Sequence, residues 1–136
     1  MNTFNHTRKL FANGEITLTN LKVMLTNGYT FAPAETTMTN ATAAEVSGNG
    51  WVAGGPTIAS AAITIANTDG AKLDGNDISV TASGGPIGPA DGLVVYDATG
   101  SWPLFHDSFA SQEAGDGTAF KVTWDAAGIH VWQDVV

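Results

Sequence analysis

The chain has 136 residues and a net charge of −8, and 13% of its residues are charged, about half of the roughly 25% that is usual in globular proteins. Five Lys and Arg residues against thirteen Asp and Glu residues oppose binding to phosphate backbones, which requires clustered cations, so we expect no nucleic-acid partner. The chain has no cysteine and no apolar run of the ~18 to 20 residues that span a membrane, so we expect a soluble protein, made in the cytoplasm and stabilised by packing or by assembly.

The first predicted element is a short helix over residues 3–13, where apolar residues recur at roughly helical spacing and Thr3 or Asn5 can cap the free amides. Residues 15–25 then change to an alternation of apolar and polar residues, which predicts a strand with a break near its middle. Residues 37–46 contain enough Ala, Met and Glu to predict a second short helix.

From residue 57 onward, short apolar segments alternate with turn signals. The predicted strands span residues 57–66, 71–73, 78–82, 93–96, 102–109, 118–124 and 129–132. Within 118–124, Phe120, Val122 and Trp124 alternate with polar residues, which predicts one buried face. Residues 83–92 are predicted to be a turn segment, and residues 115–117 and 126–128 are predicted to be hairpin turns.

This spacing of strands is typical of all-β proteins. We expect a mainly β fold, either an antiparallel β-sandwich or a jelly-roll-like barrel, with about seven or eight short strands and two short helices in the N-terminal third. No repeat or linker is visible, so residues 1–136 are expected to form a single β-sandwich domain, with residues 1–13 as a short N-terminal helix or arm.

The sequence contains no signature of catalysis or metal binding. His6, His106 and His130 lie in different predicted elements, and no two have the spacing of metal ligands. Residues 69–77 are rich in Asp, Asn and Gly, as calcium loops are, but their spacing fits two turns around a short strand better than an EF-hand. Gly-x-Ser-x-Gly is absent, and the glycine-rich stretch at 48–55 lacks the Lys of a phosphate loop. We expect a protein that is not an enzyme, without cofactor or metal.

Some residues are candidates for contact with partner proteins. Ten of the thirteen acidic residues lie from Asp69 onward, whereas Arg8 and Lys9 lie near the start, which favours the N-terminal arm for electrostatic contact. His130 and Trp132 are two positions apart on the last predicted strand, so they share a face that we interpret as an interface. The predicted partner-binding residues are Phe4, Arg8, Lys9, His130 and Trp132.

Several segments together resemble a known family. They are FN at 4–5, ITL at 16–18, LKVMLTN at 21–27, AEV at 44–46, GNGWVAGG at 48–55, LDGNDI at 73–78 and ASGGPIGP at 82–89. In order and spacing they are similar to small virion structural proteins of tailed phages. The resemblance implies a capsid decoration or cement protein, which stabilises the head by packing on the major capsid protein and on copies of itself. It implies a location on the capsid surface of the virion, after synthesis in the host cytoplasm, and a homotrimer is the expected assembly.

A second interpretation stays open. Aromatic faces stack on sugar rings, so the aromatic residues could form a platform in a tail-associated or fibre component that binds a host surface glycan or another tail protein. These residues are Trp51, Trp102, Trp124, Trp132, Tyr29 and Tyr96. Core packing is the commoner use of such side chains. A hydrolase would require a constellation that forms only in three dimensions.

Overall fold

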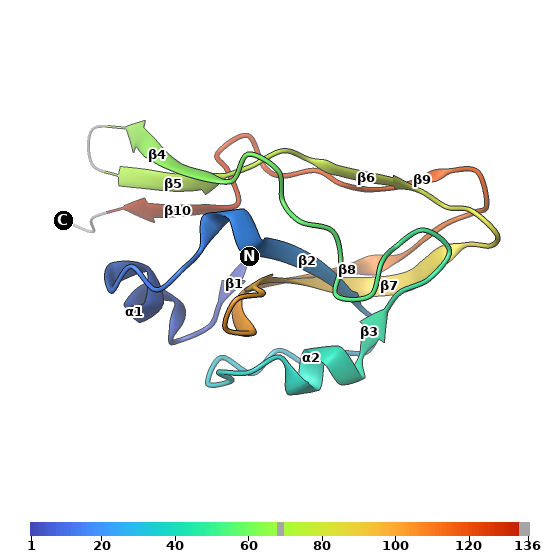
Figure 1. Cartoon of the computed structure of the whole chain (residues 1–136), viewed down its shortest axis with the longest axis horizontal. Helices are drawn as coiled ribbons and strands as arrows, with labels where there is room; N and C mark the ends of the chain where they lie inside the picture. The colour runs from blue at the N-terminus through green and yellow to red at the C-terminus, as the bar shows by residue number, and fades with distance from the viewer. Residues whose placement is uncertain (68–69, 134–136) are drawn as a thin grey trace.

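Two layers of antiparallel strands make up most of the molecule, with one short helix at an end and another beneath the larger sheet (Figure 1). The structure is a computed structural model, and it describes residues 1–67 and 70–133. These residues form ten strands and two α-helices, which confirms the predicted mainly β class with two short helices in the N-terminal third. Two of the strands have only two residues each, too short for a sequence pattern to predict.

The larger layer is a five-stranded sheet in the order β1-β8-β7-β2-β3. Its strands are β1 (Asn2–Thr3), β2 (Leu21–Thr26), β3 (Glu45–Val46), β7 (Ile87–Asp97) and β8 (Trp102–Ala114). The second layer consists of a three-stranded sheet, β10-β5-β4, and a two-stranded ribbon, β6-β9. Its strands are β4 (Ala62–Asn67), β5 (Gly70–Asp74), β6 (Ile78–Thr81), β9 (Ala119–Val122) and β10 (His130–Gln133).

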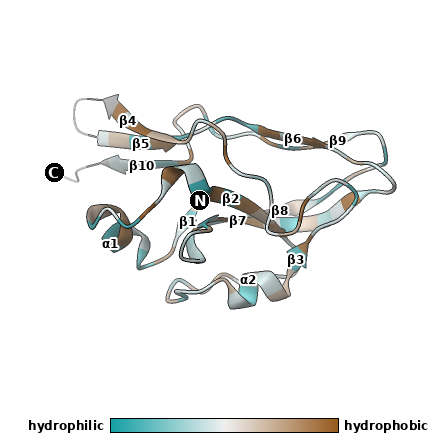
Figure 2. Ribbon diagram, in the orientation of Figure 1, coloured by the Kyte–Doolittle hydropathy of each residue, from teal (hydrophilic) through white to brown (hydrophobic). Residues whose placement is uncertain are grey.

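The main core lies between these layers, and β2 contributes much of it (Figure 2). Leu21, Val23 and Leu25 of β2 are fully buried, and each such side chain contributes roughly 1.5 to 3 kcal/mol to stability. In the second layer, the predicted alternation at residues 118–124 is confirmed. Phe120 and Trp124 are buried in the core, whereas Lys121 between them is exposed.

A smaller core covers the opposite face of the five-stranded sheet. Its buried residues are Phe4, Met24, Met38, Ala41, Val94 and Tyr96. Helix α2 (Thr39–Ala43) supplies Ala41, and Tyr29 and Phe31 pack against the cluster from the preceding loop. The central strands β2 and β7 are therefore covered on both faces, which explains why nearly every residue of β2 is buried.

The N-terminal predictions need correction. Helix α1 spans Thr7–Ala12 rather than residues 3–13, and neither Thr3 nor Asn5 caps it, because residues 2 and 3 form β1 and pair with β8. Burial of Phe4 holds this stretch extended against the sheet. Of the predicted strand at 15–25, only β2 is a strand, and it follows a 3-10 turn at Leu18–Asn20. The boundaries of these N-terminal elements are thus set by long-range strand pairing and not by local propensity.

Three predictions about turns are also wrong. The segment 83–92 is not all turn, since β7 begins at Ile87. The turns at 115–117 and 126–128 do not close hairpins, because β9 pairs with β6 and β10 pairs with β5. At both turns the chain leaves one sheet for another, a choice that turn residues do not encode.

Candidate functional site

The predicted partner-binding residues are divided between the surface and the two cores. Arg8 and Lys9 are exposed on α1, while His130 and Trp132 are half-buried on β10. The structure brings these four residues to one end of the molecule, where α1, β4, β5 and β10 lie together (Figure 1). Phe4 lies elsewhere, in the smaller core, and its side chain is 1% exposed. The Phe4 ring packs edge-to-face on Phe31. In the folded chain the side chain of Phe4 is therefore not available for contact with a partner.

His130 and Trp132 share a face, as the alternation predicted, but that face points inward. The His130 ring stacks on Phe105 of β8 at 4.7 Å between centroids, and Trp132 packs edge-to-face on Phe11 of α1 at 5.0 Å. Burial lowers the pKa of His130, and the nearby N-terminal amine and Arg8 lower it further. His130 thus attaches β8 to β10, and Trp132 attaches α1 to β10. Only the exposed parts of these two side chains remain available to a partner.

The same sheet face continues outward to two exposed isoleucines on β4. In the strand register, Ile63 lies opposite Leu73, whose other neighbour is His130, and Ile65 lies opposite Ala71, whose other neighbour is Trp132. Residues directly opposite each other point to the same face. Ile63 and Ile65 therefore extend the apolar row beyond the core, and they are 44% and 86% exposed.

Strand β4 is also an edge strand. It ends the order β10-β5-β4, and no strand in the described ranges pairs with its outer side. Its sequence, AITIAN, has no charged residue and no proline. Natural proteins usually protect an open edge with such residues, because an unpaired row of N–H and C=O groups accepts another strand. We call residues Ile63, Thr64 and Ile65 with their open backbone the β4 edge.

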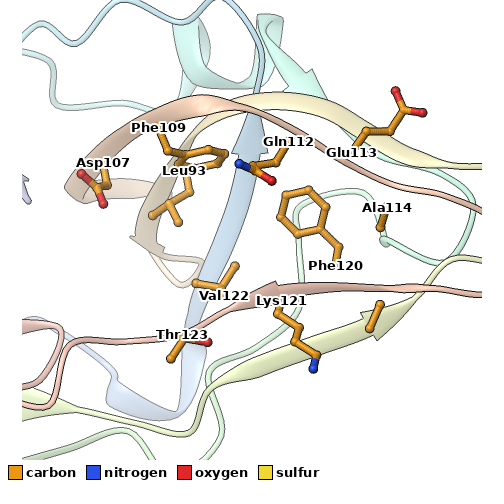
Figure 3. A pocket seen from close by; sticks show the side chains of 11 residues that line it. Leu93, Asp107, Phe109, Gln112, Glu113, Ala114, Phe120, Lys121, Val122 and Thr123 are labelled. Carbon is orange, nitrogen blue, oxygen red and sulfur yellow. The ribbon is translucent and has the colours of Figure 1, made fainter.

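A groove of about 290 Å³ lies between the β7–β8 ribbon and β9 (Figure 3). Figure 3 shows Phe109, Phe120 and Val122 around the hollow, whereas Glu113 and Lys121 point away from it. Polar and apolar groups contribute about equally to the lining of the groove, and the charged ends of Glu113 and Lys121 are directed away from it. Such a groove can bind a ligand by apolar contact, with Gln112 and Thr123 able to form hydrogen bonds.

Tyr29, Glu35 and His106 form a second group of polar side chains, beside the smaller core. The Tyr29 hydroxyl donates to Glu35 at 2.7 Å, and Asn40 donates to the other Glu35 oxygen at 2.8 Å. Burial and the adjacent Glu35 raise the pKa of Tyr29 well above its usual value, so the phenol stays protonated. The His106 ring stacks on Phe31 and meets the edge of Tyr29, both at 5.3 Å. These contacts hold the loop before α2 against the five-stranded sheet.

No group of three or more His, Asp and Glu side chains within residues 1–67 and 70–133 could hold a metal ion. The loop considered for calcium begins at Asp69, which lies outside the described residues. In its described part, Asp74 accepts from the Gly75 amide and forms an ion pair with Lys72 at 3.3 Å. Likewise, no helix in the described ranges is long and apolar enough to cross a membrane.

The aromatic residues considered for a sugar platform are used mainly in packing. Trp51, Trp124 and Tyr96 are buried, at 1%, 8% and 7% exposure. Trp102 and Trp132 are half-buried and pack against the main core. The six rings therefore do not form one exposed surface.

Comparisons of the chain with protein-family models, with curated proteins and with solved structures gave no match. The resemblance to tailed-phage virion proteins thus stays a prediction. The surface feature that sequence reasoning missed is the β4 edge. A strand was predicted over residues 57–66, but alternating isoleucines ordinarily indicate a buried face, so their exposure could not be read from the pattern.

Proposed function

We propose that the protein is a non-enzymatic structural subunit of a tailed-phage virion. In this role it is a capsid decoration (cement) protein that stabilises the head by packing on the major capsid protein and on copies of itself. The observation that supports this role best is the β4 edge, an uncharged open strand that carries a side chain 86% exposed at Ile65. An edge of this kind suits a subunit that is covered by a neighbour in its working state.

The composition supports the same role. With 13% charged residues, much of the surface is neutral and can lie against another protein without desolvating many ions. Contacts that are weak singly become strong when a subunit is repeated on a lattice, because linked copies bind with high effective concentration. A homotrimer at local three-fold positions remains the expected assembly.

The test is a cryo-electron-microscopy reconstruction of the virion of the phage that encodes this chain. We expect density of this β-sandwich at symmetric positions on the outer capsid, with the end that carries Arg8 and Lys9 among the contacts. Absence of the chain from the particle would refute a virion role. Deletion of the N-terminal arm is a poor substitute for this experiment, because it removes β1 and the buried Phe4 and so damages the fold.

The groove between the β7–β8 ribbon and β9 supports a second candidate function. A tail-associated or fibre component that binds a host surface glycan needs an aromatic face with polar groups around it, and half-buried Phe109 with Gln112 and Thr123 provides this combination. Density confined to the tail, together with glycan-array binding that is lost in Phe109→Ala, would favour this candidate over the capsid role.

A further inference from the structure

We infer that β4 pairs with β4 of a second copy of this chain, in an antiparallel contact around a two-fold axis. The contact joins two three-stranded sheets into one six-stranded sheet, β10-β5-β4 followed by its symmetry copy. The inference rests on the proposed role as an assembly subunit, and it specifies the partner and the geometry of one contact. The register and the charge of the strand both favour a second copy as the partner.

The two-fold geometry fits the positions of the isoleucines. Side chains alternate between the faces of a strand, so a two-fold axis perpendicular to the sheet keeps residues of the same parity on one face. With the axis at Thr64, Ile63 of each copy lies opposite Ile65 of the other. The four isoleucines then form cross-strand pairs on the face that also carries Trp132, and pairs of β-branched side chains stabilise a sheet. The pairing uses the regular part of β4, because its register shift relative to β5 comes after Ile65.

The charge distribution also favours a second copy. In a two-fold contact each residue lies near its own equivalent, so any charge on the contact repels itself. Strand β4 has no charged residue, and the two charges on the adjacent β5, Lys72 and Asp74, neutralise each other at 3.3 Å. In a chain with net charge −8, these strands are a place where two copies can approach without repulsion between contacting groups.

The other edge strands either carry a charge or lack an exposed apolar side chain. Strands β1, β6 and β10 contain no Lys, Arg, Asp or Glu, but none of them has a large apolar side chain that is exposed. Strand β3, which ends the five-stranded sheet, has Glu45, and β9 of the two-stranded ribbon has the exposed Lys121. A charge at an edge prevents pairing with an identical edge. Strand β4 combines an uncharged edge with two exposed isoleucines, and this combination favours it over the other edges for pairing.

The contact is small. A pairing along one short strand buries less than the ~800 Å² per partner of a standard stable complex, so we expect weak dimers in solution and a strong contact only when it is repeated on a lattice. It is compatible with a homotrimer, because dihedral assemblies combine two-fold and three-fold axes.

Cross-linking tests the register directly. The chain has no cysteine, so Thr64→Cys introduces a single thiol at an exposed position. Opposite residues in an antiparallel pair have Cβ atoms about 4.5 to 5.5 Å apart, close to the distance that a disulfide requires. Mild oxidation of concentrated protein is expected to give a covalent dimer. The control is Ser79→Cys on β6, which is also exposed and is expected to stay monomeric under the same conditions.

Sedimentation velocity tests the isoleucines. Ile65→Lys places two like charges across the contact, so the dissociation constant of the self-association is expected to rise at least about tenfold. Val52→Lys makes the same change of charge at another exposed apolar residue, 59% exposed and away from β4, and it should leave the constant unchanged. Thermal melting of both variants checks that each is folded.

The inference is overturned if Thr64→Cys cross-links no faster than Ser79→Cys, or if Ile65→Lys and Val52→Lys affect association equally. These outcomes are separate from failure of the proposed function. Loss of the β4 contact with the chain still present on the capsid rejects the pairing alone. Pairing through β4 with the chain absent from the virion rejects the capsid role alone.

Discussion

His106 shows how a single buried residue links packing to pH. Its ring is 4% exposed and stacked on Phe31, and its Nδ1 atom has no hydrogen-bond partner within residues 1–67 and 70–133. Burial lowers its pKa, although the carboxylates of Asp107 and Asp91 oppose this change. His130 has a lowered pKa for the same primary reason. In both cases the folded chain binds a proton less readily than the unfolded chain does.

We therefore predict that the protein loses stability as the pH falls below about 6.5, the pKa of histidine in an unfolded chain. Above that pH both states bind few protons at histidine, so the full stability is present. Below that pH the unfolded state binds protons first. At about pH 5.5, each of the two histidines therefore lowers the free energy of unfolding by at most about 1.4 kcal/mol. Chemical denaturation at about pH 7.5 and at about pH 5.5 measures the loss. His106→Phe, which keeps the ring but cannot titrate, should reduce it, and an unchanged pH dependence in that variant would contradict the explanation.

At the scale of elements, the segment 52–58 matters because it completes the edge of β2. The Val23 amide donates to Pro56 at 3.1 Å, and the Ile58 amide donates to Leu21 at 2.8 Å. Gly55 makes this approach possible. A Cβ atom at Gly55 would lie 1.6 Å from the Val23 carbonyl oxygen, and its φ of +79° is one that other residues rarely adopt. Gly55, which belongs to the glycine-rich stretch at 48–55, is thus a packing requirement.

We predict that Gly55→Ala destabilises the fold by about 3 kcal/mol or more, since the methyl group can be accommodated only if the segment moves away from β2. Gly14→Ala is the matched control. Gly14 has a similar φ of +68°, but a Cβ atom there meets no atom of the described residues within 4 Å, so the expected cost is only the backbone strain of about 1 to 2 kcal/mol. Urea denaturation of both variants measures the difference. Equal losses of unfolding free energy in the two variants would show that the close approach of residue 55 to Val23 does not cause the destabilisation.

At the scale of the whole molecule, charge is unevenly distributed. The net charge is −8, while Arg8 and Lys9 are exposed on α1 at the same end as β4. Two copies repel each other at long range through their acidic residues, even if they touch through an uncharged strand. Salt should therefore weaken an association through ion pairs and strengthen an association through the β4 edge.

We predict that salt strengthens the self-association of the protein. Raising the ionic strength from about 10 mM to about 150 mM shortens the Debye length from about 30 Å to about 8 Å, which screens the repulsion between copies and leaves strand pairing intact. Sedimentation at the two salt concentrations is expected to show a several-fold lower dissociation constant at the higher one. Weaker association at higher salt would indicate that ion pairs, such as those between α1 and acidic residues of another copy, hold the copies together.

The sequence by itself determined the local features of this protein. It predicted the mainly β class, the two short helices and the buried face of Phe120, Val122 and Trp124, because alternation and turn residues act over a few positions. It also predicted that His130 and Trp132 share a face. These properties follow from the geometry of a strand and need no knowledge of its neighbours.

Tertiary structure alone decided which strands pair and which faces meet water. The burial of Phe4, the pairing of β9 with β6 and the exposure of Ile63 and Ile65 all depend on segments far apart in the chain. The same alternation of isoleucines would form a core strand if another layer covered it. At β4 the layer ends, so the alternation that usually indicates a core strand here produces an open edge. The arrangement of the sheets, and not the local sequence, creates the candidate contact.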